Sequence, residues 1–243
     1  MNILIPIAGN NDINVEKNEY IKGLYEIQNK IVIQHVYESL NKIDNANFIF
    51  VLRIEDVKKY HLDDTIRLLD PSAKIIISEG TTQGSACSCL LAVEYIDSNE
   101  PLIISGVDQI ITRNWKEIVE EFNNKKYDCG VICFEAVHPK WSYVKLNDEG
   151  YVVESAEKRP ISKLATTGQY YFKYGSDFIQ AAENMIMKGA SVEGQYYVCP
   201  SFNELVLKQK KIGCIKIDNS EYFSLKDQRG MDDYEEYLKG VNK

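Results

Sequence analysis

Histidine is scarce in this chain, which has three in 243 residues. They lie far apart, on an expected helix face, in a second helix and in a turn beside a proline: His35, His61 and His138. This pattern contains neither a Ser/His/Asp triad nor a trio of metal-binding side chains. We therefore assign the histidines no catalytic role.

Cysteine pairs with zinc-ligand or redox spacing are also missing. The six cysteines include no Cys-x-x-Cys, and each lies in an apolar segment: Cys87, Cys89, Cys129, Cys133, Cys199 and Cys214. Free cysteine packs as a small hydrophobic side chain. We expect all six to be reduced core residues and not disulfides or metal ligands.

Long apolar runs and an excess of positive charge are absent too. No run approaches the roughly 18 consecutive apolar residues of a membrane-spanning helix, and residues 1–6 lack the charged-then-apolar order of a signal peptide. We therefore expect a cytoplasmic protein. The formal net charge of -8 argues against a broad nucleic-acid surface, because phosphate backbones are bound by clustered Lys and Arg. An anionic ligand would need a few placed cations and a divalent metal ion.

What the chain does have is an alternation of short apolar runs and amphipathic stretches. With 44% hydrophobic residues it can bury a full core, and we expect one α/β domain over residues 1–243. Up to about residue 113 the alternation predicts a mostly parallel sheet with helices on both faces. The expected strands are 1–8, 47–53, 74–78 and 101–106, and the expected helices are 30–43, 55–69 and 85–95.

The pattern changes from Tyr127 onward. Four strand candidates follow with little helix between them, which predicts an antiparallel extension of the sheet: 127–135, 142–146, 151–156 and 167–173. Two helices, a strand and a terminal helix are expected after them, at 175–188, 199–210, 212–217 and 231–239.

Asp108 is the strongest single candidate for a site. It follows an apolar strand, and ligands in open α/β sheets gather at the carboxyl ends of strands. A carboxylate there can hold Mg²⁺ or Mn²⁺, with the remaining positions left to nucleotide phosphates. A turn-capping aspartate would give the same spacing, so both interpretations stay open. A second metal ligand is also open among Asp218, Glu221 and Asp227.

The loop 79–86, between the third expected strand and its helix, is the second candidate. Gly80 and Gly84 let the backbone approach a ligand closely, and the Gln83 amide can donate and accept hydrogen bonds at a base edge. Ser85 fits either a nucleotide-binding role or a helix N-cap.

Two further segments carry anion-binding chemistry. Lys158 and Arg159 are adjacent cations after a strand in an acidic chain, and they suit a phosphate; solvated surface charge would give the same pattern. The loop after the first strand has the position of a phosphate-binding loop but only one glycine. Its candidates are Ala8, Gly9 and Asn10.

Taken in order, these segments resemble the sugar-phosphate nucleotidyltransferases of the nucleotide-diphospho-sugar transferase fold. That fold is a Rossmann-like, GT-A-like mixed sheet. The resemblance spans nearly the whole chain and rests on residues 5–9, 20–27, 80–86, 106–109, 157–160 and 167–172. Residues 197–204, Tyr-Val-Cys-Pro-Ser-Phe-Asn-Glu, are more similar still to capsule-cluster members of this family.

The resemblance implies a role for each candidate residue. Residues 1–113 would bind the NTP and residues 114–243 the acceptor. The expected nucleotide-binding residues are Ala8, Gly9, Asn10, Gln83, Gly84 and Ser85. The expected catalytic residues are Lys22 on the triphosphate or attacking phosphate, Asp108 on the metal ion and Lys158 on the acceptor phosphate. The acceptor pocket would add Glu157, Gly168 and Tyr143.

The implied reaction joins the NMP of an NTP to a phosphorylated small metabolite and releases pyrophosphate, in bacterial capsular or other surface-polysaccharide synthesis. Some capsule-cluster relatives use CTP, and one acts on a phosphorylated glutamine. We therefore favour a cytidylyltransferase such as phosphoglutamine cytidylyltransferase. The 16 tyrosines are typical of a polar-aromatic surface and suggest a homodimer interface.

Departures from the family pattern keep two alternatives open. The family loop reads Gly-x-Gly-x-Arg, but residues 11–13 supply neither the second glycine nor the arginine, and Lys17 is a candidate substitute. Ile21 and Gly23 replace both prolines of the family's Pro-Lys-Pro-Leu segment. The alternatives are a degenerate nucleotide-binding protein and a glycosyltransferase of the same fold. A glycosyltransferase should show an Asp-x-Asp motif, and residues 108–110 contain one carboxylate.

Overall fold

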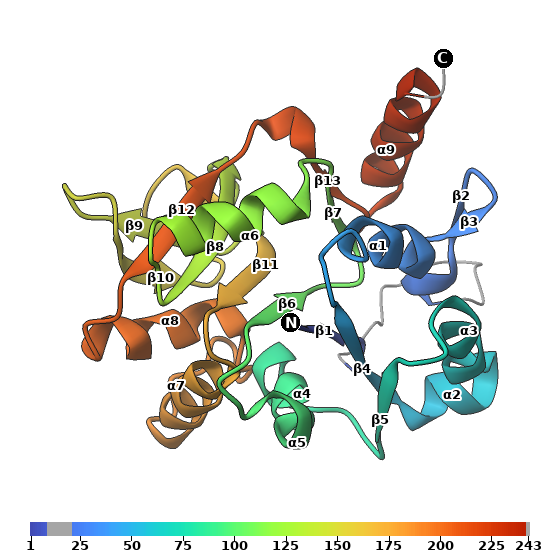
Figure 1. The fold of residues 1–243 in the computed structure, drawn as a ribbon, viewed down its shortest axis with the longest axis horizontal. Coiled ribbons are helices and arrows are strands. Elements are labelled where there is room, and N and C mark those ends of the chain that lie inside the picture. The colour runs from blue at the N-terminus through green and yellow to red at the C-terminus, as the bar shows by residue number, and fades with distance from the viewer. Residues whose placement is uncertain (9–20, 242–243) are drawn as a thin grey trace.

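The first half of the chain forms the parallel part of a mixed nine-stranded sheet (Figure 1). The computed structural model describes residues 1–8 and 21–241. Four parallel strands lie in the order β6-β1-β4-β5, with the bounds β1 (Asn2–Pro6), β4 (Asn47–Arg53), β5 (Lys74–Ser78) and β6 (Leu102–Ser105). The helices between them are α1 (Val32–Leu40), α2 (Ile54–Tyr60), α3 (Leu62–Leu69), α4 (Ser85–Leu90) and α5 (Val93–Ile96).

Alternate residues of the parallel strands face two helical layers. Ile3 and Ile5 belong to a core that includes α1 and α3, whereas Leu4 and Ile49 belong to a second core with α4. A strand buried on both faces needs an unbroken apolar run and not an alternating one. This explains why all of Leu102–Ser105 is buried.

The second half of the chain extends the sheet with mostly antiparallel strands. The strand β11 pairs antiparallel with β6 and β8, and β12 closes the edge parallel to β8. The bounds are β8 (Cys129–Glu135), β9 (Tyr143–Leu146), β10 (Val152–Ala156), β11 (Leu164–Phe172) and β12 (Ile212–Lys216). The helices here are α6 (Trp115–Asn124), α7 (Gly175–Met187) and α8 (Val198–Leu207).

Two small ribbons and the last helix lie outside the main sheet. The strand β13 (Tyr222–Ser224) pairs with β7 (Gln109–Ile111), directly after Asp108. The other elements are η1 (Lys22–Leu24), β2 (Glu26–Ile27), β3 (Lys30–Ile31), η2 (Asn219–Glu221) and α9 (Gln228–Val241). In Figure 1 α9 lies at the upper right, above α1 and beside β2 and β3. The pairing of β13 with β7 brings the C-terminal segment back to the end of β6.

The predicted fold class is confirmed: a mixed α/β sheet flanked by helices, parallel in its first half and with an antiparallel extension. Four of the six cysteines are buried core residues, and Cys87 and Cys214 are partly exposed. Within residues 1–8 and 21–241, none of the helices combines the length and the apolar character that crossing a membrane requires.

Three helical predictions differ from the structure. The expected helix 85–95 is divided into α4 and α5, because the amides of Leu91 and Ala92 bond three residues back, to Ser88 and Cys89, and end the α-helical turn. The expected helix 55–69 is broken into α2 and α3 at His61, whose backbone φ of 52° is left-handed. The helix α6 was not predicted, although Trp115, Ile118 and Phe122 repeat at helical spacing and the Asn114 side chain caps the helix by accepting from Lys116 N at 2.9 Å.

Candidate active site

A cavity of about 520 Å³ opens at the carboxyl ends of β1 and β6. After β1 the chain adds β4 and β5 on one side of β1, and it then crosses to add β6 on the other side of β1. The direction in which strands are added to the sheet therefore reverses at β1. Open α/β sheets bind ligands at such a reversal point. The lining residues are Pro6, Ile7, Thr81, Thr82, Gly84, Ser85, Ser88, Gly106, Val107, Asp108, Gln195 and Tyr197.

Asp108 lines this cavity directly after β6. Its backbone oxygen accepts a hydrogen bond from Leu225 N at 2.8 Å, but its carboxylate makes no hydrogen bond or ion pair with any residue that the structure describes. The turn-capping interpretation therefore has no support. An unpaired carboxylate on the wall of a cavity is suited to an incoming cation.

Lys22 begins η1 and is half-buried near Asp108. Burial lowers the pKa of its ammonium group below the usual value, and the charge of Asp108 opposes this change. The next residue, Gly23, packs against Val107, because a Cβ at Gly23 would lie 3.5 Å from Val107 Cγ2. The structure thus brings together two predicted catalytic residues that are 86 positions apart in the sequence.

Two charged residues near Lys22 come from the segment after β13. Lys226 lowers and Asp227 raises the pKa of Lys22. Of the three candidates for a second metal ligand, Asp218 and Glu221 are engaged with each other's backbone in a capping box on η2. Asp227 accepts from Gly230 N at 2.9 Å and keeps one carboxylate oxygen toward Lys140, at 3.9 Å. Asp227 is therefore the candidate that the geometry favours.

Gly84 joins the predicted nucleotide loop to the segment 195–197. Its backbone φ is 110°, and a Cβ there would lie 2.4 Å from the Tyr196 carbonyl oxygen. Tyr196 N donates to the Gln83 oxygen at 2.7 Å, and Ala86 N donates to the Tyr196 oxygen at 2.9 Å. This close backbone approach forms one wall of the cavity and explains the glycine.

Ser85 is not a helix N-cap. Gly84 occupies the N-cap position of α4, and the Ser85 hydroxyl accepts from Val198 N at 3.3 Å. The side chain of Gln83 is exposed. The nucleotide-binding roles of Gln83, Gly84 and Ser85 stay predictions, and Gly84 and Ser85 line the cavity.

Glu157 and Lys158 follow β10 on the acceptor side. The Ser142 hydroxyl donates to Glu157 Oε2 at 2.5 Å. Burial raises the pKa of the Glu157 carboxyl above its ordinary value, against the opposing effect of this hydrogen bond. Lys158 Nζ donates to Glu193 Oε2 at 2.6 Å and lies 5.5 Å from the centre of the Tyr197 ring. Lys158 is thus part of an exposed ion pair beside a residue that lines the cavity, and its role on the acceptor phosphate stays a prediction.

Gly168 and Tyr143 occupy tightly packed positions behind the acceptor side. Gly168 has a backbone φ of 82°, and a Cβ there would lie 2.1 Å from Gln109 Oε1. Tyr143 is fully buried, and its hydroxyl donates to the His138 carbonyl at 2.7 Å. The acceptor-binding roles of both residues stay predictions. Sequence reasoning did not single out Gln109, whose buried Oε1 has no hydrogen-bond partner in the described structure.

Three predicted residues concern the loop after β1. Ala8 is fully buried. Gly9 and Asn10 lie outside the described residues, as does Lys17. Among residues 1–8 and 21–241, no group of three or more His, Cys, Asp or Glu side chains converges to form a complete metal site. A metal ion at Asp108 would therefore take most of its ligands from elsewhere.

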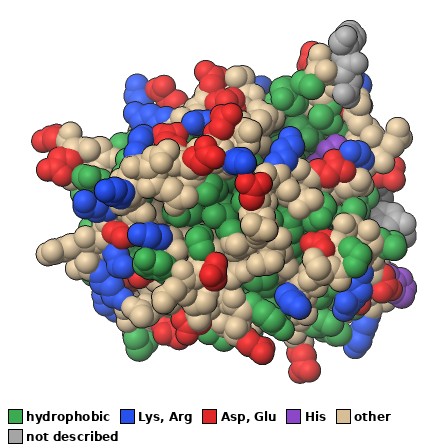
Figure 2. Space-filling view, in the orientation of Figure 1, with side chains coloured by type: hydrophobic (Ala, Val, Ile, Leu, Met, Phe, Trp, Pro, Cys, Tyr) green, Lys and Arg blue, Asp and Glu red, His purple; other side chains and the backbone are tan. Residues whose placement is uncertain are grey.

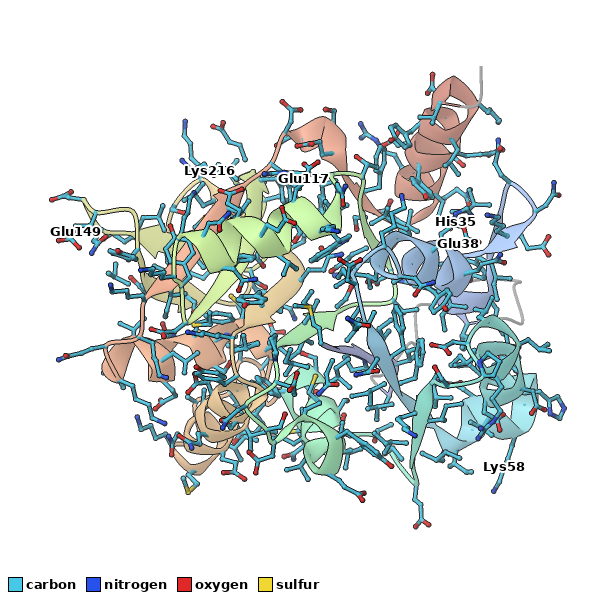
Figure 3. The ribbon with its side chains drawn as sticks, in the orientation of Figure 1. His35, Glu38, Lys58, Glu117, Glu149 and Lys216 are labelled. Carbon is cyan, nitrogen blue, oxygen red and sulfur yellow. The ribbon has the colours of Figure 1, made fainter. Side chains whose placement is uncertain are left out.

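The face of the molecule in Figure 2 carries Lys and Arg side chains interspersed with acidic ones, and no broad basic area. Figure 3 shows the same mixture in sticks: Lys58 and Lys216 lie on opposite sides of the molecule, and Glu149 lies at its left edge. The cations that the site uses are placed singly.

Solved structures share this fold along nearly the whole chain. A nucleoside-diphosphate-sugar pyrophosphorylase from Vibrio cholerae RC9 superposes with a TM-score of 0.80 at 22% identity, over 98% of this chain and 99% of that chain. An inositol-1-phosphate CTP transferase from T. maritima gives a TM-score of 0.75 at 12% identity, over 100% and 96%. UDP-glucose pyrophosphorylase complexed with UDP-glucose gives 0.74 at 17% identity, over 98% of both chains.

Sequence comparison adds the family itself. No curated protein matches the chain. A family model described as nucleotidyl transferase matches residues 18–196, which is more than half of the chain and includes Lys22, Gly84, Asp108 and Lys158. The chain therefore belongs to the nucleotidyl transferase family.

Proposed function

We propose that this protein transfers the nucleotidyl group of an NTP to a phosphorylated small metabolite and releases pyrophosphate. The observation that carries the proposal is that Asp108 lines a cavity on the carboxyl ends of β1 and β6, and that half-buried Lys22 lies near enough for the charge of Asp108 to affect its pKa. This is an anion site built with one cation and one unpaired carboxylate.

In this reaction an oxygen of the acceptor phosphate attacks the α-phosphorus of the NTP. A new phosphorus–oxygen bond forms as the bond from the α-phosphorus to the bridging oxygen breaks, and pyrophosphate leaves with that electron pair. No protein nucleophile is needed, so the side chains act by positioning and by neutralising charge. Lys22 would neutralise the triphosphate, Lys158 would hold the acceptor phosphate, and Glu157 would accept a hydrogen bond from the acceptor.

The residues present fit a magnesium ion of the kind that nucleotides carry. Mg²⁺ keeps several waters and is bound by one or two carboxylates together with substrate phosphates. Asp108 would supply one such carboxylate, and Asp227, whose charge acts on the same lysine, is our candidate for the other. When bound, the ion would stabilise charge on the phosphate oxygens as a Lewis acid.

We further propose CTP as the nucleotide, and a role in the cytoplasmic steps of capsular or other surface-polysaccharide synthesis, with phosphoglutamine as one candidate acceptor. Three features support this choice: the departures from the sugar-phosphate pattern at residues 11–13, the resemblance of residues 197–204 to capsule-cluster members, and a CTP transferase among the structural neighbours.

The test is a screen for pyrophosphate release, with four NTPs against a panel of phosphorylated metabolites at millimolar Mg²⁺. Release with CTP and at least one acceptor is expected. Release with another NTP would retain the reaction and overturn the choice of nucleotide. Nucleotide binding without any release would instead support the degenerate binding protein, and glycosyl transfer from a nucleotide sugar would support the glycosyltransferase.

A further inference from the structure

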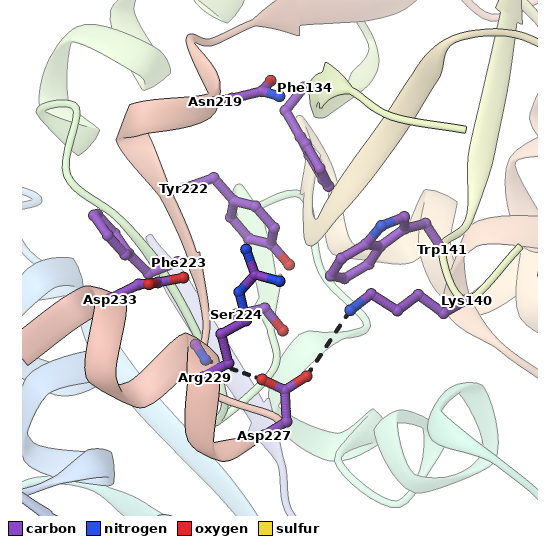
Figure 4. Close-up of a pocket in the computed structure, with 11 residues that line it drawn as sticks. Phe134, Lys140, Trp141, Asn219, Tyr222, Phe223, Ser224, Asp227, Arg229 and Asp233 are labelled. Atoms are coloured by element: carbon purple, nitrogen blue, oxygen red, sulfur yellow. Dashed lines mark hydrogen bonds and ion pairs between the residues drawn. The ribbon is translucent and has the colours of Figure 1, made fainter. Parts of the chain in front are cut away.

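A second cavity, of about 550 Å³, lies between β13, the first turn of α9 and the loop before β9 (Figure 4). We call it the distal pocket. Its aromatic, hydroxyl and cationic lining residues are Phe134, Lys140, Trp141, Tyr222, Ser224 and Arg229, and its acidic ones are Asp227 and Asp233.

The base of the distal pocket is aromatic and carries unpaired hydroxyl groups. The Phe134 and Tyr222 rings are 4.5 Å apart, and Trp141 lies 5.9 Å from Tyr222. Tyr222 is only 8% exposed, and its hydroxyl lies close enough to the buried Ser224 hydroxyl for Ser224 to lower its pKa, but neither hydroxyl meets the geometry of a hydrogen bond with any described residue. A buried polar group without a partner is costly, so such groups point to a missing ligand.

The rim of the distal pocket is cationic. Arg229 makes no ion pair or hydrogen bond with any residue of the described chain, and Figure 4 shows its guanidinium pointing between Tyr222 and Trp141. Lys140 lies 4.7 Å from the centre of the Trp141 ring. The helix α9 also begins here, and its N-terminus favours negative charge.

The pocket also contains two acidic residues, Asp227 and Asp233, which equal Lys140 and Arg229 in number. Asp227 accepts from Gly230 N at 2.9 Å and lies 3.9 Å from Lys140. In Figure 4 Asp233 lies on the α9 side, across the pocket from Trp141. Within the described residues Asp233 makes no ion pair with Arg229, so the guanidinium remains for a ligand, together with the Tyr222 and Ser224 hydroxyl groups.

The distal pocket adjoins the candidate active site. Asp227, which lines it, also affects the pKa of Lys22. Burial raises the pKa of the Tyr222 phenol, and the charge of Asp108 adds to this rise. On the other side, Ser142 follows Trp141 in the chain and binds Glu157. An acceptor with its phosphate near Lys158 would reach the distal pocket along Ser142 and Trp141.

We infer that the distal pocket binds a carboxylate of the acceptor, so that the acceptor carries an anionic group in addition to its phosphate. This inference rests on the proposed function. Arginine binds carboxylates in bidentate fashion, and hydroxyl donors complete the contact. A single unpaired guanidinium matches one negative charge, which favours a carboxylate over a second phosphate.

The same geometry argues against a cationic acceptor. Aromatic rings can bind quaternary ammonium groups through their faces. Here Lys140 and Lys226, which lies 5.9 Å from the Trp141 ring centre, already occupy that role. A further cation would also meet the unpaired charge of Arg229.

The test compares acceptors that share one scaffold: glucose 1-phosphate, glucuronate 1-phosphate and glucose 1,6-bisphosphate. Glycerol 3-phosphate and 3-phosphoglycerate form a smaller matched pair. In each set we expect kcat/KM to be about tenfold higher for the carboxylate compound than for the neutral one. Tenfold is the lower end of what a charge-assisted hydrogen bond contributes, and we expect the lower end because Arg229 lies at an exposed rim. Equal use of the neutral compounds, or preference for the bisphosphate, would overturn the inference.

Variants separate the pocket from general effects. Arg229→Gln and Tyr222→Phe should abolish the preference for the carboxylate through the acceptor KM, with an unchanged KM for the NTP. Arg67→Gln, at an exposed position on α3, is the matched control and should keep the preference. If the preference for the carboxylate survived Arg229→Gln, another part of the protein would be its source.

A calorimetric arm makes the two proposals separable. Binding of 3-phosphoglycerate and glycerol 3-phosphate is measured directly, with no NTP present. Carboxylate-selective binding that Arg229→Gln abolishes, without pyrophosphate release from any NTP, would reject the proposed function and retain the pocket. Pyrophosphate release without carboxylate selectivity would retain the proposed function and reject the role of the distal pocket. If neither release nor selective binding were found, both proposals would be rejected.

Discussion

Gly84→Ala should destabilise the protein and damage the cavity together. The residue has a φ of 110°, and its new Cβ would lie 2.4 Å from Tyr196 O and 2.7 Å from Tyr196 N, which are backbone atoms that cannot rotate away. Backbone strain of this kind costs about 1–3 kcal/mol. Relief by moving residues 195–197 would break two hydrogen bonds to the loop 83–86, at about 0.5–1.5 kcal/mol each.

The expected loss in the free energy of unfolding is therefore about 2–6 kcal/mol, a large part of the 5–15 kcal/mol typical of a domain. Denaturation in urea measures it, and nucleotide affinity should fall in the same variant because Tyr197 lines the cavity. Gly80→Ala is the matched control in the same loop, since a Cβ there meets nothing within 4 Å. If the two variants unfolded at the same urea concentration, the account of Gly84 would be refuted.

Substitutions at three residues test the site itself. Asp108→Asn should leave the urea midpoint of unfolding nearly unchanged while removing most turnover, because it deletes an unpaired carboxylate and no core contact. If the variant turned over at the wild-type rate at ordinary Mg²⁺, Asp108 would not belong to the site. Lys22→Ala should lower kcat by about 100- to 1000-fold, and Lys22→Arg should restore little rate. Burial lowers the pKa of Lys22, so this lysine should lose its charge at a lower pH than an ordinary lysine, whose pKa is 10.5. Wild-type activity should therefore decline as the pH rises toward that value, and the residual activity of Lys22→Arg should show no such decline. Burial raises the pKa of Glu157, so its carboxylate is lost at a higher pH than the usual 4.5; the acceptor KM should rise as pH falls through that range in the wild type and stay flat in Glu157→Gln.

Much of the fold was predictable because the parallel strands are continuous apolar runs, both in β4, which is buried on both faces, and in β5 at the edge of the sheet. The predicted strands 47–53 and 74–78 have the bounds that β4 and β5 have in the structure, and apolar runs between charged or polar flanks define them. The helix α6 carried a usable signal in its apolar spacing and its Asn114 cap. The break at His61 had none, because the apolar pattern continues through Leu62 and Ile66.

The candidate site was predictable where a strand end fixes a residue locally. Asp108 follows an apolar strand, and the Gly84 loop follows another. Lys226 and Asp227 reach the site only because β13 pairs with β7, more than 100 residues earlier in the chain. Tyr197 reaches it through backbone hydrogen bonds of Tyr196 to the loop 83–86. Neither pairing has a local pattern that a single sequence displays.

The contact between Lys158 and Glu193 gives a prediction whose sign depends on the role of the lysine. Hydrogen bonding to Glu193 raises the pKa of Lys158 and holds its ammonium 2.6 Å from the carboxylate. If Lys158 binds the acceptor phosphate, that phosphate must displace Glu193. Glu193→Gln should then lower the acceptor KM, and Lys158→Ala should raise it by about tenfold to a hundredfold.

The size of the Glu193 effect follows from its exposure. The Glu193 side chain is 71% exposed, and ion pairs in such positions contribute about 0.2–1 kcal/mol, which corresponds to a decrease in KM of up to roughly fivefold. Steady-state kinetics with the acceptor varied at saturating NTP measures it, and Glu183→Gln on α7, also exposed, is the matched control. If Lys158 instead only anchors the wall at Tyr197, both Glu193→Gln and Lys158→Ala should raise the acceptor KM. A rise in both variants would therefore remove Lys158 from the acceptor phosphate, while opposite changes would place it there.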